Sequence, residues 1–104
     1  MIVVNTDYIS GKNLETLGMV FASTVQTKNM FKDIGAGLKN LLGGELGSYT
    51  KMMDEAKEIA INRMVEKARS MGADGIVNVR FSTSSITPGS TEVAASGTAV
   101  KFIN

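Results

Sequence analysis

The stretch that decides the fold is "SYTKMMDEAKEIAINRMVEKARSMGADG", from Ser48 to Gly75. Its apolar residues recur every three or four positions as far as Met71, which is the period of an α-helix. They spread over an arc of roughly 200°, so the helix is expected to pack on its own sheet and on a second surface. Gly72 follows where a left-handed C-cap ends a helix. The spacing predicts one long helix from Ser48 or Tyr49 to Met71.

Two strands are predicted after this helix. "DGIVNVRFSTS", from Asp74, places Val77, Val79 and Phe81 in alternation with polar residues, and "TEVAASGTAVKFI", from Thr91, is rich in Val, Ala and Thr. The segment between them contains the only proline beside a glycine, which is typical of a loop or hairpin connection.

Extended structure is also predicted before the helix, over residues 2–26, with a polar turn region around "ISGKN", from Ile9 to Asn13. Within "LETLGMVFASTVQT" one strand face is bulky and the other mostly small. The bulky face consists of Leu17, Met19, Phe21 and Val25. This pattern fits a sheet with a helix layer on one side and a closely packed neighbour, such as another subunit, on the other.

The period changes again from Lys28 to Leu42, where apolar residues recur at intervals of four. Lys28, Lys32 and Lys39 cluster opposite this stripe, so the segment is predicted to be a short amphipathic helix. The predicted order is strand, helix, helix, strand, strand in a single α+β domain, residues 1–104. The lysine face has two interpretations, a solvated surface or a small anchor that lies on an anionic membrane.

Composition excludes several kinds of site. The 11 basic and 10 acidic residues nearly balance, so no nucleic-acid partner is predicted. Cysteine and histidine are both absent, which excludes Ser-His and Cys-His nucleophiles and the usual zinc and copper sites. The methionines of the long helix are interpreted as core residues rather than as Cu(I) ligands. We find neither a signal-peptide core nor an apolar run of membrane-spanning length, so a cytoplasmic location is expected.

A glycine-rich segment, "NLLGGELGSYTKMMDEA", precedes the long helix at Asn40 to Ala56. It lacks the lysine of a phosphate-binding P-loop, and "GAGLKN" from Gly35 lacks the third glycine of a dinucleotide-binding turn. One interpretation is a ligand site, in which Gly43, Gly44, Ser48 and Tyr49 present free amide groups to an anion. The other is helix termination at the glycines with Ser48 as the next N-cap. The carboxylates are typical of solvated ion pairs, and no catalytic residue is predicted.

The whole chain resembles the YbjQ-like family of small bacterial proteins, which carries a heavy-metal-binding label. The resemblance rests on "GGELGSYTKMMDEAKEIA", on "ARSMGADGIVNV" and on "SGTAV" from Ser96 to Val100, and it extends to "NMFKDIGAGLKNLLGG". It implies a two-layer, dodecin-like α+β subunit with an antiparallel sheet, assembled as a homopentameric ring. Such a ring would account for the broad apolar arc of the long helix and for the small-residue strand face. Because Cys and His are absent, no metal site and no cofactor are predicted.

The expected function is a cytoplasmic homo-oligomer that serves as a binding or structural module for a small ligand, an ion or a partner. One alternative is an enzyme whose site lies between subunits, with Gly43, Gly44, Ser48 and Tyr49 completed by a neighbour. The other is association with a membrane surface through the Lys28 to Leu42 helix.

Overall fold

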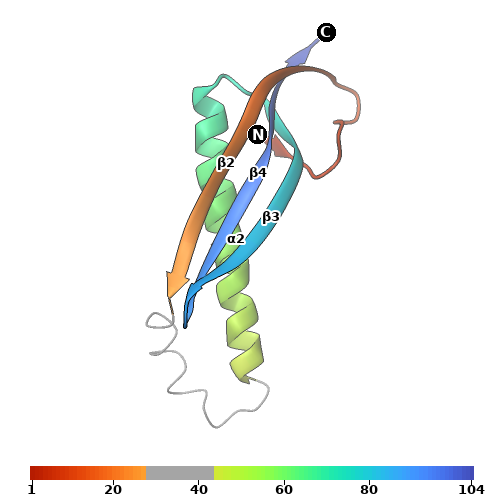
Figure 1. Ribbon diagram of the computed structural model, residues 1–104. Coiled ribbons are helices and arrows are strands. Elements are labelled where there is room, and N and C mark those ends of the chain that lie inside the picture. The colour runs from red at the N-terminus through yellow and green to blue at the C-terminus, as the bar shows by residue number, and fades with distance from the viewer. Residues whose placement is uncertain (28–43) are drawn as a thin grey trace.

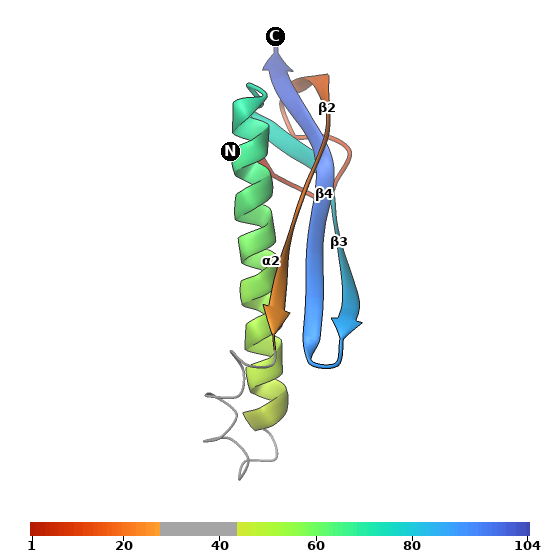
Figure 2. The ribbon, with the colours of Figure 1, turned by 60° about the vertical axis from the view of Figure 1, so that its left-hand side comes forward.

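The computed structural model describes residues 1–27 and 44–104. Its elements are strands β1 (Ile2–Val3) and β2 (Asn13–Thr27), helix α2 (Gly44–Ser70), and strands β3 (Gly75–Thr87) and β4 (Ser90–Ile103). The strands form one sheet in the order β1-β3-β4-β2, and α2 lies across one of its faces (Figures 1 and 2). The predicted two-layer α+β architecture is therefore confirmed. The predicted helix from Lys28 to Leu42 lies outside the described residues.

The sheet is mixed rather than purely antiparallel. The pairs β2–β4 and β3–β4 are antiparallel, as expected, but β1 runs parallel to β3, with Ile2 opposite Gly75. The sequence predicts a polar turn around "ISGKN" within residues 2–26 but only one strand in the element order, whereas the structure has two. In the structure a loop with a turn at Gly11, where φ is 75°, separates β1 from β2 and lets the two strands pair at opposite edges of the sheet. The prediction of an antiparallel sheet is wrong at this edge.

Helix α2 ends in the way that the sequence predicted. Gly72 has a φ of 81°, and the amides of Ala73 and Gly72 donate to the carbonyls of Ala68 and Arg69. This is the Schellman arrangement, in which a left-handed residue after the last helical turn satisfies two of its free carbonyls. The start of the helix differs from the prediction, because α2 already begins at Gly44.

Substituting Gly72 measures the energetic cost of placing a residue with a side chain in this left-handed conformation. Nothing lies within 4 Å of a Cβ placed there, so Gly72→Ala introduces backbone strain without a steric clash. We expect the free energy of unfolding to fall by about 1–2 kcal/mol, since an L-residue is disfavoured in this conformation. Urea denaturation measures the change. Gly72→Asn is the matched control, and its free energy of unfolding should fall less, because asparagine tolerates positive φ. Equal decreases for the two variants would contradict the explanation.

The main core lies between α2 and the sheet. The residues of α2 that are completely buried follow one another at intervals of four: Ala56, Ala60, Met64 and Ala68. Three of them are alanines, which lets the helix backbone approach the sheet closely. Opposite them lies the small-residue face of β2, including Val20 and Ala22. The sequence analysis attributed that face to a neighbouring subunit, and the structure shows instead that it packs on the helix of its own chain.

Two of the three register shifts in the antiparallel pairs move residues away from the faces that simple alternation predicts. The register of β2 shifts between Thr16 and Gly18, and Leu17 packs against the main core instead of sharing a face with Met19. The register of β3 shifts between Val77 and Arg80, where Asn78 has a φ of 55°. A bulge inserts one extra residue and so reverses the alternation beyond it.

As a result of the second bulge, Val77 and Val79 lie on opposite faces, although the sequence predicted one shared face. Val77 belongs to a second cluster with Ile9 and Val100, on the sheet face away from α2, while Val79 belongs to the main core. The loop before β2 covers this second cluster. Among the described residues, no helix is long and apolar enough to cross a membrane.

Candidate functional site

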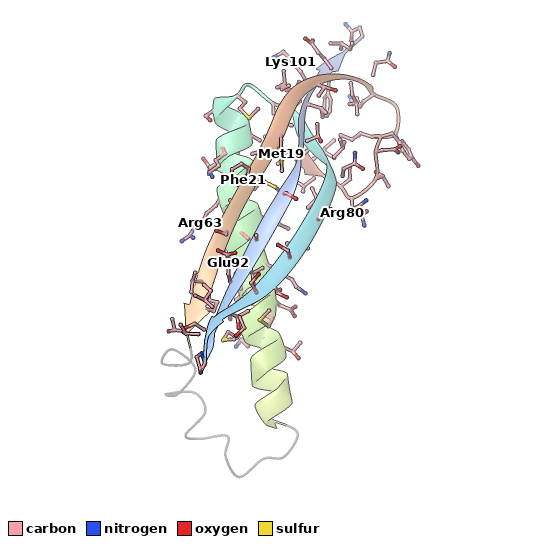
Figure 3. The ribbon with its side chains drawn as sticks, viewed as in Figure 1. Met19, Phe21, Arg63, Arg80, Glu92 and Lys101 are labelled. Atoms are coloured by element: carbon pink, nitrogen blue, oxygen red, sulfur yellow. The ribbon has the colours of Figure 1, made fainter. Side chains whose placement is uncertain are left out.

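The candidate site is the part of the sheet face opposite α2 that the loop before β2 leaves open. Three large apolar side chains of β2 project from it, and they are exposed by 70% (Met19), 61% (Phe21) and 47% (Val25). We call these three residues the β2 ridge; Figure 3 shows Met19 and Phe21 on the strand. Because the strand alternates, burying its small residues under α2 forces these large ones outward. Exposed apolar patches of this kind mark interaction surfaces.

The rest of the open face is lower and more polar. Phe21 lies opposite Ser96 of β4, which in turn lies opposite Arg80 of β3, so one row across the sheet runs from aromatic to small to cationic. Two rows further along the same face, Val25 lies opposite Glu92. Met19 and Phe21 of the β2 ridge therefore lie along one side of the open face, and Arg80 of β3 lies on the other side (Figure 3).

Two cations of α2 reach the edge of β2 that faces away from β4, beside this ridge. Arg63 donates from Nη1 to the carbonyl oxygen of Ser23 at 2.8 Å, and Lys67 donates from Nζ to that of Phe21, also at 2.8 Å. Lys67 Nζ also lies 5.0 Å from the centre of the Phe21 ring. Such a contact contributes about 0.5–1 kcal/mol at an exposed position. The ridge thus has a cationic border on its outer side.

The residues predicted as a ligand or surface site are only partly described. Gly43, Lys28, Lys32 and Lys39 lie outside the described residues. Gly44, Ser48 and Tyr49 all fall in the first turns of α2. Ser48 lies inside the helix, four residues after its start, so its predicted role as N-cap is wrong.

Sequence reasoning recognised the bulky strand face but did not find Arg63 and Lys67. Their four-residue spacing puts them on one side of the helix, which the sequence does show. Which side of α2 faces this edge of β2 depends on how the helix crosses the sheet, and no local pattern encodes that crossing.

Comparison with known proteins identifies the family. The YbjQ family model, described as "Putative heavy-metal-binding", matches residues 1–103. A UPF0145 protein of Clostridium novyi is 57% identical over 103 residues, which cover 99% of this chain and 100% of the relative. The chain belongs to the YbjQ-like family. A second YbjQ-like relative, a UPF0145 protein of Methanosarcina acetivorans, is 55% identical and covers 100% of this chain and 99% of its own.

A solved structure supports the same fold. The crystal structure of a protein of unknown function of the DUF74 family, from Pediococcus pentosaceus, matches with a TM-score of 0.72. The match covers 99% of this chain and 98% of that one, at 17% identity. At that identity the likeness shows the fold alone.

The heavy-metal description does not fit the donor atoms of this chain. Heavy-metal sites use thiolate or imidazole ligands, and the sequence has no cysteine and no histidine. Among residues 1–27 and 44–104, no group of three or more acidic side chains is placed to hold a metal ion. Of the thioethers, Met64 is completely buried in the main core. The open face of this YbjQ-like chain offers apolar contact area with a cationic border, which suits a macromolecular partner.

Proposed function

We propose that the chain acts as a homo-oligomeric binding or structural module, the pentameric ring that its resemblance implies, and that the β2 ridge is a subunit contact. The observation that carries the proposal is the exposure of Met19, Phe21 and Val25 along one strand face that no other element of the described residues, 1–27 and 44–104, covers. Burying Phe21 alone in a contact would contribute about 1.5–3 kcal/mol.

The dimensions of the subunit also favour assembly. Its Cα radius of gyration is 16.8 Å, whereas a compact domain of about 100 residues has one of about 13 Å. Among residues 1–27 and 44–104, the main core consists of one helix on one sheet, and the open face of that sheet carries no second layer beyond the loop before β2. A second copy packed on the open face would supply the missing layer.

The proposal predicts that Phe21→Asp dissociates the assembly while each subunit stays folded. A carboxylate in an apolar contact would be desolvated without a partner, whereas at the surface of a free subunit it is solvated. Native mass spectrometry gives the subunit count of wild type and variant, together with any retained ligand, and far-ultraviolet circular dichroism checks the fold.

Tyr8→Asp is the matched control for this variant. Tyr8 is an aromatic residue of similar exposure, 59%, but it lies in the loop before β2 rather than on the ridge. It should keep the wild-type subunit count. A wild-type protein that is monomeric at micromolar concentration would refute the proposed function, and a Phe21→Asp variant with unchanged mass would exclude the ridge as the contact.

A further inference from the structure

A second apolar patch lies on the other side of the subunit, between α2 and β3. Phe81 pairs with Ala95 of the main core, so it lies on the helix side of the sheet, yet its side chain is 42% exposed. Lys57 Nζ of α2 lies 6.0 Å from the centre of its ring. Ile61 and Val65 follow Lys57 at intervals of four on the same helix stripe, and both are only half-buried. We call Ile61, Val65 and Phe81 the α2–β3 patch.

The β2 ridge and the α2–β3 patch lie on opposite faces and opposite sides of the sheet. The ridge is on the open face of β2, and the patch is on the helix face beside β3, with β4 between the two strands. A two-fold symmetric contact uses one patch twice, whereas a head-to-tail contact that closes a ring uses two different patches. Two unlike apolar patches are what a head-to-tail contact needs.

The charges beside the two patches differ in sign: two cations border the ridge on its outer side, whereas two carboxylates border the patch, whose nearby cation, Lys57, lies over the Phe81 ring. Arg63 and Lys67 border the ridge through their bonds to the carbonyls of Ser23 and Phe21. Asp54 and Glu58 border the patch, because Glu58 precedes Ile61 by three residues and Asp54 precedes it by seven. Both carboxylates are exposed, and neither forms an ion pair within the described part of the chain.

These charges discriminate between the two contact geometries. A two-fold contact through the ridge would bring Arg63 and Lys67 of both copies together, and juxtaposed like charges oppose association. A head-to-tail contact would instead bring them to the carboxylates of the neighbour. Resting on the proposed function, we infer that the occupant of the β2 ridge is the α2–β3 patch of a second copy, with Arg63 and Lys67 facing Asp54 and Glu58 of that copy.

Complementary charge reversal tests this pairing. Asp54→Lys with Glu58→Lys should raise the dissociation constant of the assembly about tenfold or more, and Arg63→Glu with Lys67→Glu should do the same. The variant that combines all four substitutions should recover most of the wild-type affinity, because every pair is again opposite in sign. Lys51→Glu with Glu55→Lys is the matched control, since this exposed pair lies on the side of α2 away from the sheet and should leave assembly unchanged. A four-fold variant no better associated than either double variant would overturn the pairing.

Cross-linking gives a second test that does not depend on the helix cations. The chain has no cysteine, so Ser23→Cys, beside the ridge, and Glu58→Cys, beside the patch, introduce the only thiols. A short bismaleimide should link subunits of the protein that carries both substitutions into a ladder of covalent oligomers. Neither single variant should be linked. Dimers from Ser23→Cys alone would show a two-fold contact and refute the inference.

The outcomes separate this inference from the proposed function. If Phe21→Asp dissociates an oligomer but the doubly substituted protein is not cross-linked, the pairing of these two patches is wrong and the oligomeric module stands. If the wild-type protein is a monomer, both fail together at the first measurement.

Discussion

Replacing Gly97 with alanine is expected to lower the free energy of unfolding by about 1–3 kcal/mol, the usual cost of overpacking a core. A Cβ at this position would lie 2.6 Å from Cγ2 of Ile76 and 3.0 Å from the carbonyl oxygen of Val77. Gly97 lies in β4 opposite the bulge of β3, where the extra residue brings the two backbones and the Ile76 side chain unusually close. The carbonyl belongs to the backbone of a central pair of strands and cannot move aside without breaking the pairing.

Urea denaturation at a fixed protein concentration measures this loss, since assembly also contributes to stability. Ser96→Ala is the neighbouring control. Its side chain points to the open face and is only half-buried, so its change should stay within about 0.5 kcal/mol. If Gly97→Ala were as stable as the wild type, the close approach at the bulge would not be what excludes a side chain there.

Truncating Met64 is the second substitution with a large expected effect. Its side chain is fully buried in the main core. It lies between Ala60 and Ala68 on the same helix stripe. Met64→Ala should lower the free energy of unfolding by about 2–5 kcal/mol, because the small residues around it cannot fill the cavity. Because it is the one large residue in an otherwise alanine stripe, it supplies much of the apolar volume that α2 contributes there.

Met64→Leu is the matched comparison, since it nearly conserves volume and should cost less than about 1.5 kcal/mol. Chemical denaturation of both variants gives the two values. The pair also separates packing from ligation, because leucine has no sulfur. A leucine variant as unstable as the alanine variant would contradict the assignment of Met64 to the core.

Individual helices and strands could be predicted from the sequence wherever a local pattern, such as helical periodicity or alternation, was clear. The four-residue spacing of apolar positions and Gly72 predicted α2 and its end, alternation predicted β2 and β3, and a composition rich in Val, Ala and Thr predicted β4. Alternation failed at Leu17 and Val77, because each lies beside a bulge that adds one residue and reverses the faces. A glycine at position 18 and an asparagine at position 78 permit such bulges, but neither requires one.

The candidate site was harder to predict, because it depends on which strand face the helix covers. The sequence showed that β2 has a small face and a bulky face, and the expected ring assembly attributed the small one to a neighbour. The alanines of α2 place the small face under the helix of the same chain instead, because a helix with short side chains fits closely over small residues. That match between Ala60 and Ala22 joins residues far apart in the chain, so it becomes evident only once the layers are placed together.

The bonds from Arg63 and Lys67 to the edge of β2 also bear on how the protein avoids misassembly. An unpaired strand edge is a template on which identical chains can add one after another into fibrils. Here two of the carbonyls that such a growing sheet would use already accept hydrogen bonds from side chains of the same subunit. Extension of the sheet would have to displace both cations, whereas packing on the open face leaves them in place. The same two residues that border the β2 ridge thereby occupy two acceptors that amyloid-like growth along this edge would need.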